Sequence, residues 1–115
     1  MDLVRGKYSY HYSKQMGRMP EKYARYYSSE AIIALNYLDT HGIIQRDMKL
    51  ENILLNNDGH IKLADYGACR EEGPDQKYRS NARTKIYKSP EFIQDLVYNK
   101  AVDFWAIGTV IFELL

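Results

Sequence analysis

The sequence predicts an α+β fold that is mainly helical, in a single domain of 115 residues. Two segments of helical length, Glu21–Thr40 and Ala101–Leu115, are amphipathic or apolar and predict the main helices. Between them, two short apolar runs around Asn56–Gly59 predict a small β-hairpin. A chain of this length has room for one domain with an adequate hydrophobic core.

The composition is typical of a globular protein and argues against several other classes. Hydrophobic residues make up 45% and charged residues 27%, which is ordinary for a globular protein, and the formal charge of +1 does not favour a nucleic-acid surface. The single cysteine, Cys69, excludes an intramolecular disulfide and suits a reducing compartment. The most apolar segment, Phe104–Leu115, is too short to span a bilayer. We therefore expect a cytoplasmic protein with no membrane span and no nucleic-acid partner.

The N-terminal segment has an alternating pattern. Tyr8, Tyr10 and Tyr12 alternate with polar residues, and this period of two favours an edge strand. The alternative is a stacking surface for single-stranded nucleic acid, which the few neighbouring basic residues do not favour.

The first helix is predicted by apolar residues at spacings of three and four, namely Ala24, Tyr27, Ala31, Leu35 and Leu38. Pro20 suits a helix start, and Gly42 supplies a C-terminal stop. We expect this helix to cover about Glu21 to Thr40.

The later elements follow from turn residues and composition. Ile53–Leu55 and Ile61–Leu63 should form the hairpin strands, with Gly59 able to take a positive φ. Residues 64–88 are polar and without helical period, which predicts a long loop. Ser89-Pro90-Glu91 should open a short helix reaching about Asp95. The final segment is apolar on nearly every side, which is typical of a helix buried all round.

A set of polar residues lies between two apolar runs, with Arg46, Asp47, Lys49 and Asn52 inside seven residues. Downstream follow Asp65-Tyr66-Gly67, then Ser89-Pro90-Glu91, then Asp103-x-Trp105-x-x-Gly108. Taken singly, an aspartate in a loop more often caps a turn than performs chemistry, Asp65-Tyr66-Gly67 is typical of a turn, and Ser89-Pro90-Glu91 is typical of a helix start. In this order the series resembles the large, C-terminal lobe of eukaryotic serine/threonine protein kinases. Leu35–Glu72 is most similar to the protein kinase C group, its atypical branch in particular.

The resemblance implies the chemistry of phosphoryl transfer from ATP with Mg²⁺ to a protein hydroxyl. Asp47 would orient or accept the proton of the attacking hydroxyl, and Lys49 would place a positive charge near the transferred group. Asn52 and Asp65 would supply oxygen ligands to Mg²⁺. Asp103 would cap the backbone of the catalytic loop from the last helix.

The resemblance also assigns binding and regulatory residues. Asp2 and Val4 fall on the hinge that contacts ATP, and Leu54 would floor the adenine pocket. Glu51 would bind a basic side chain of a protein or peptide substrate, and Thr84 would face that substrate. Arg46 would pair with a phosphate on Ser80, ordering the long loop. The alternative is a solvated arginine and unmodified hydroxyls.

The sequence departs from the family at several positions. Gln45 replaces a His or Tyr that would join an apolar stack with Tyr66, and burying an unpartnered amide costs about 1–3 kcal/mol. Arg83-Thr84-Lys85 replaces the common Gly-Thr-Pro.

The sequence also contains no glycine-rich loop or third-strand lysine, so the resemblance implies a partial domain, 1–115, without the small lobe and final helices. Part of the surface of Phe104, Trp105, Ile107, Val110 and Ile111 should then be exposed. The alternative function is a non-catalytic kinase remnant that binds a protein partner through exposed helices.

Overall fold

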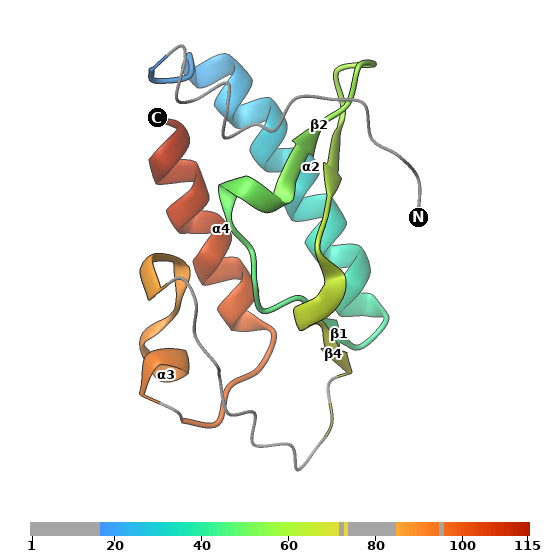
Figure 1. Cartoon of the computed structure of the whole chain (residues 1–115), viewed down its shortest axis with the longest axis vertical. Helices are drawn as coiled ribbons and strands as arrows, with labels where there is room; N and C mark the ends of the chain where they lie inside the picture. The colour runs from blue at the N-terminus through green and yellow to red at the C-terminus, as the bar shows by residue number, and fades with distance from the viewer. Residues whose placement is uncertain (1–16, 72, 74–84, 95) are drawn as a thin grey trace.

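The computed structural model describes residues 17–71, 73, 85–94 and 96–115. The tyrosine-rich segment at residues 8–12 and four predicted site residues, Asp2, Val4, Ser80 and Thr84, lie outside the described residues. The described elements are α2 (Glu21–Thr40), β1 (Ile43–Ile44), η1 (Leu50–Asn52), β2 (Ile53–Leu55), β3 (Ile61–Leu63), η2 (Tyr66–Ala68), β4 (Arg70–Glu71), η3 (Lys85–Tyr87), α3 (Pro90–Ile93) and α4 (Ala101–Leu114). This mainly helical arrangement with small β-pairs confirms the predicted α+β class (Figure 1).

Helix α2 begins and ends at the predicted residues. Its buried residues are small or branched, Ala24, Ser28, Ala31 and Leu35, and this face packs against α4. Pro20 caps the N-terminus with φ −56°, and Gly42 follows the C-terminus with φ +66°. Only a residue without Cβ adopts that left-handed conformation at no steric cost, so Gly42 ends the helix as its sequence position predicts.

The β2–β3 hairpin also forms at the predicted residues, with Ile53 opposite Leu63 and Leu55 opposite Ile61. Gly59 takes φ +88° in the turn. A second antiparallel pair joins β1 to β4, with Ile43 opposite Glu71. The sequence did not predict this pair because each strand has only two residues and Arg70–Glu71 carries no apolar pattern.

Helix α4 corrects one prediction, because it is not buried all round. Its buried residues are Val102, Asp103, Ala106, Ile107, Val110 and Leu114. Trp105 is 51% exposed and Phe112 84% exposed on other sides of the helix. Of the five side chains expected to be partly exposed, Phe104 and Trp105 are exposed and Ile111 is half-buried, but Ile107 and Val110 are buried. Among the described elements, α2 and η3 make the main contacts with α4, and they lie against its buried face.

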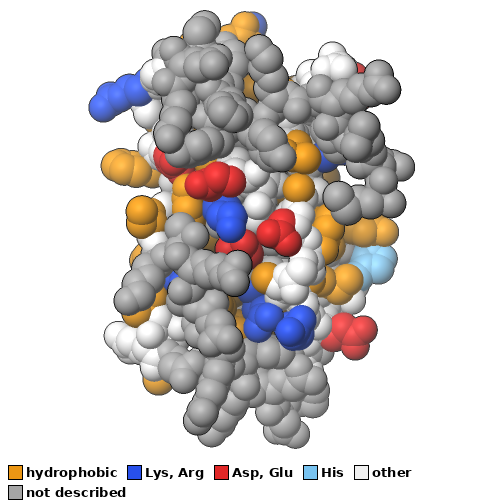
Figure 2. Space-filling model, in the orientation of Figure 1, with side chains coloured by type: hydrophobic (Ala, Val, Ile, Leu, Met, Phe, Trp, Pro, Cys, Tyr) orange, Lys and Arg blue, Asp and Glu red, His pale blue; other side chains and the backbone are white. Residues whose placement is uncertain are grey.

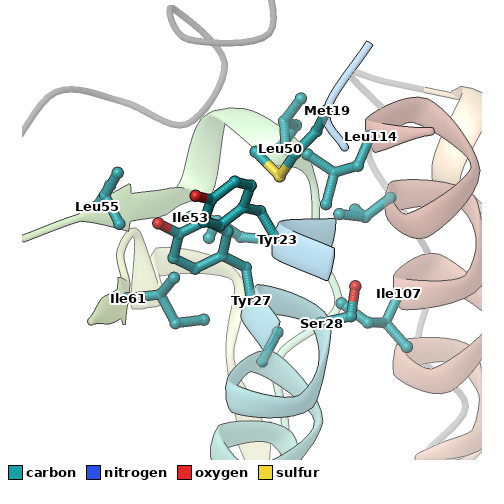
Figure 3. A pocket seen from close by; sticks show the side chains of 12 residues that line it. Met19, Tyr23, Tyr27, Ser28, Leu50, Ile53, Leu55, Ile61, Ile107 and Leu114 are labelled. Atoms are coloured by element: carbon teal, nitrogen blue, oxygen red, sulfur yellow. The ribbon is translucent and has the colours of Figure 1, made fainter. Parts of the chain in front are cut away.

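The hydrophobic core lies between α2, α4 and the β2–β3 hairpin, and a partly open apolar cavity of about 270 Å³ lies against it (Figure 3). Ile53 and Leu55 line it from the hairpin, and Ile107 lines it from α4. Ser28 contributes a hydroxyl that is buried and has no hydrogen-bond partner among the described residues. No helix in the described ranges is long and apolar enough to cross a membrane.

Glu30 on α2 ties the helix to the start of β3. One of its carboxylate oxygens lies 2.5 Å from His60 Nδ1, and the other accepts the Ile61 N–H at 2.9 Å. The hydrogen bond to Glu30, followed by the attraction of its charge, raises the pKa of His60. Burial alone raises the pKa of Glu30, but the hydrogen bonds from His60 and Ile61 outweigh it and lower that pKa.

We expect this contact to make the thermal midpoint depend on pH. Because the pKa of His60 is raised in the folded state, His60 contributes its full stabilisation below its ordinary pKa of 6.5. This stabilisation is lost as the pH rises through the pKa of the folded state. Because the pKa of Glu30 is lowered in the folded state, Glu30 contributes its full stabilisation above its ordinary pKa of 4.5. This stabilisation is lost as the pH falls through the pKa of the folded state. The contribution should therefore be largest between about pH 4.5 and 6.5.

The measurement is the thermal midpoint across this pH range for the chain and for His60→Gln. The variant should lose the decline on the high-pH side. His41→Gln is the matched control, because His41 contacts the Tyr37 carbonyl and not Glu30. An unchanged profile in His60→Gln would show that the contact with Glu30 contributes nothing to stability.

Candidate active site

The loop between β1 and β2 is held from a distant helix. Asp103, in the first turn of α4, accepts the Gln45 N–H at 2.7 Å with Oδ2 and the Arg46 N–H at 2.8 Å with Oδ1. Burial raises the pKa of the Asp103 carboxyl, and these two N–H groups act in the opposite direction. Arg46 itself takes φ +65°, a left-handed conformation that L side chains rarely adopt. The predicted cap by Asp103 is confirmed.

Three of the predicted active residues meet at the carboxylate of Asp47. Lys49 Nζ lies 2.7 Å from Asp47 Oδ2. Asn52 Nδ2 donates to the Asp47 carbonyl at 2.8 Å and to Oδ2 at 3.2 Å. The Asp47 side chain is 27% exposed, so the carboxylate is ordered by its neighbours and still open to a reactant. In the orientation of Figure 1, acidic and basic side chains gather near the centre of the molecule (Figure 2).

Asp65 adjoins this group through the backbone. The N–H of Ala64 donates to the Asn52 carbonyl at 2.8 Å. Because Asp65 follows Ala64, this bond places the backbone of Asp65 close to Asn52. Asp65 is exposed, takes φ +59°, and accepts the Gly67 N–H at 3.3 Å with Oδ1. A Cβ on Gly67 would lie 3.2 Å from that oxygen, so a side chain at this position would require the Asp65 carboxylate to shift by a few tenths of an ångström.

The donor chemistry of Asn52 and Asp65 suits a hard cation. The Asn52 Nδ2 group is engaged by Asp47, which leaves its amide oxygen as the acceptor. An amide oxygen and a carboxylate are ligands that Mg²⁺ prefers, with phosphate and water completing its shell. Within the described ranges no cluster of three or more His, Cys, Asp or Glu could hold a metal. One amide oxygen and one carboxylate are thus a donor set that fits a cation whose remaining ligands come from phosphate and water.

Arg46 makes contacts that its sequence position did not predict. Its Nε donates to the Ala68 carbonyl at 2.7 Å, and its Nη1 donates to the Tyr98 hydroxyl at 3.1 Å. Tyr98 is buried and packs on Phe92, with ring centroids 4.5 Å apart. The guanidinium thus joins η2 to the segment before α4. The predicted pairing with Ser80 lies outside the described residues.

Glu51 and Leu54 flank the site. The Glu51 carboxylate has one buried oxygen, Oε2, without a hydrogen-bond partner among the described residues. Leu54 pairs with Lys62 and is absent from the cavity that Ile53 and Leu55 line. Because successive side chains of a strand point to opposite faces, Leu54 faces away from that cavity.

Sequence reasoning missed Lys88 as a neighbour of the site. Its ammonium lies 4.4 Å from the Phe92 ring centroid, and it lines a small recess with Arg46 and Asp47. Burial lowers the pKa of Lys88, and the charge of Asp47 raises it. Its position two residues before Pro90 gave no signal of this contact.

Comparison with known proteins identifies the class. The family model described as protein kinase domain matches residues 1–115, and the chain belongs to the protein kinase family. Protein kinase C zeta type of Oryctolagus cuniculus is 44% identical over 111 residues, covering 96% of this chain and 19% of the relative. Atypical protein kinase C of Drosophila melanogaster is 40% identical over 116 residues, covering 100% of this chain and 19% of the relative.

A further relative, the serine/threonine-protein kinase akt-2 of Caenorhabditis elegans, is 40% identical over 117 residues, covering 100% of this chain and 22% of the relative. The chain thus spans about a fifth of the length of these curated relatives. The predicted resemblance to serine/threonine kinases of the atypical protein kinase C type is confirmed.

Proposed function

We propose that this chain carries the phosphoryl-transfer residues of an ATP-dependent serine/threonine protein kinase. The observation that supports this most directly is the convergence of Lys49 and Asn52 on the Asp47 carboxylate, at 2.7 and 3.2 Å. Phosphoryl transfer requires positioning and neutralisation of charge more than covalent chemistry from the protein. A carboxylate held between a cation and an amide, on a loop capped by Asp103, meets both requirements.

Each residue has a defined role in this proposal. Asp47 orients the substrate hydroxyl and accepts its proton, while Lys49 offsets the negative charge that develops on the transferred group. Asn52 and Asp65 would hold Mg²⁺ with their oxygens. The ion, when bound, neutralises the phosphate oxygens and lowers the repulsion that an attacking oxygen meets.

The remaining assignments extend the same proposal beyond the described contacts. Asp2 and Val4 would contact ATP at the hinge, with Leu54 on the adenine side of the hairpin. Glu51, with an unpartnered buried oxygen, would pair with a basic residue of a protein or peptide substrate near Thr84. Arg46 and Ser80 would form a regulatory pair. Residues 1–115 would then extend from the hinge to the central helix of a kinase domain.

A second function is favoured by the exposed apolar side of α4. Phe112 and Trp105 are 84% and 51% exposed, and such aromatic side chains often anchor protein interfaces. In this alternative the chain is a non-catalytic kinase remnant that binds a protein partner.

Nucleotide binding distinguishes the two functions. At ten times its Kd, Mg-ATP should stabilise the chain by about 1.4 kcal/mol and raise its thermal midpoint by roughly 4–8 °C or more. Transfer of phosphate to a basic serine peptide should also be detectable. ATP with excess chelator is the control. If Mg-ATP produces no midpoint shift and no phosphate transfer is detected, the non-catalytic interaction module is the better account.

A further inference from the structure

Gln45 makes an unusual contact inside the active loop. Its side chain is completely buried, and its Oε1 accepts the Asp47 N–H at 3.0 Å. Together with the two bonds from Asp103, three successive backbone N–H groups, those of residues 45, 46 and 47, are held by side-chain oxygens. The loop that carries Asp47 is therefore fixed from two directions.

The orientation of the Gln45 amide follows from this contact. A backbone N–H can only donate, so the oxygen of the amide must face Asp47 and the NH₂ group must point away. That Nε2 is buried and has no hydrogen-bond partner among the described residues. A buried donor without an acceptor destabilises the fold, and an apolar side chain of similar size would not incur this cost. The hydrogen bond from the Asp47 N–H to Gln45 Oε1 is the described side-chain contact that offsets the cost of burying the unpartnered Nε2.

We propose that Gln45 is a positioning residue for Asp47. By holding the Asp47 N–H it limits rotation of the backbone that presents the carboxylate to Lys49 and Asn52. Small displacements of a reacting group cost large factors in rate, so a restraint on this backbone has a catalytic consequence. The role in the reaction rests on the proposed function, whereas the restraint itself can be measured without any activity.

Gln45→Met tests the restraint because methionine has a similar length and neither an acceptor for the N–H nor an unpartnered donor. We expect hydrogen exchange of the Asp47 amide, followed by NMR, to accelerate about tenfold or more, because its acceptor is lost. The midpoint of urea unfolding should stay about the same, because the variant removes the unpartnered Nε2 of Gln45 but also leaves the Asp47 N–H without its acceptor. The rate of phosphoryl transfer should fall about tenfold with an unchanged KM for the peptide. A purely structural role for Gln45 predicts the reverse: lower stability and unchanged Asp47 exchange.

Two further variants keep the test decisive if the methionine variant does not fold. Gln45→Glu retains an acceptor at the same reach and should keep the Asp47 amide protected. Gln45→Asn retains the amide but is one methylene shorter, and should lose the protection. Equal exchange in these two variants would overturn the proposal.

A control separates the restraint from general effects of removing a buried polar group. Ser28→Ala removes another buried unpartnered group, on α2, and should change stability without changing Asp47 exchange. If the unaltered chain shows no transfer while the exchange results hold, the proposed function fails and the positioning of Asp47 by Gln45 stands.

Discussion

Replacing Asp103 by alanine should lower the free energy of unfolding by about 2–6 kcal/mol, because two buried N–H groups lose their acceptor at about 1–3 kcal/mol each. Asp103 is only 5% exposed, so water does not readily replace the carboxylate. A loss of this size approaches the whole stability of a typical domain, about 5–15 kcal/mol. Asp103→Asn keeps one acceptor oxygen and should lose about half as much. Urea unfolding followed by circular dichroism measures both.

Glu21→Ala is the matched control for Asp103, since it also removes an acidic residue from the first turn of a helix. Glu21 is exposed and pairs only with Arg25 among the described residues, so its loss should cost well under 1 kcal/mol. A cost for Asp103→Ala no greater than that of Glu21→Ala would mean that the loop keeps its shape without the cap.

Replacing Asp47 by asparagine should reduce the rate of phosphoryl transfer about 100- to 10,000-fold, the usual effect of removing a general base. The two side chains have nearly the same shape, so the loop should remain folded and the loss should appear in kcat. The measurement is incorporation of phosphate into a basic serine peptide with Mg-ATP.

Asp58→Asn is the control for Asp47, because it makes the same chemical change at an exposed carboxylate in the hairpin turn. Asp58 accepts hydrogen bonds from Asn56 and His60 and lies outside the Asp47 group. Transfer that persists in Asp47→Asn at the rate of the Asp58→Asn variant would show that another residue, or a contaminating enzyme, accepts the proton.

Local patterns predicted most of the fold. Helix α2 and the hairpin appear at their predicted residues because periodicity and turn residues are properties of neighbouring positions. The order of motifs predicted the protein kinase class and the capping role of Asp103. The grouping of Lys49 and Asn52 at Asp47 is also local, since all three lie within one short loop.

The contacts that sequence reasoning missed join segments far apart in the chain. Tyr98 reaches Arg46 across 52 positions, and neither residue type signals the other. The two-residue strands β1 and β4 carry no pattern of their own. The exposed side of α4 was mispredicted because apolar composition alone does not specify which neighbours are present to cover a helix.

The cap by Asp103 has a consequence for how the protein is made. Asp103 lies 58 residues beyond Gln45, so the ribosome completes the reactive loop long before its acceptor exists. Until the first turn of α4 emerges and docks, the N–H groups of Gln45 and of the left-handed Arg46 lack the two bonds to the Asp103 carboxylate. A nascent chain stalled before position 103 should therefore already contain α2 and the hairpin, with the Asp47 loop still unformed.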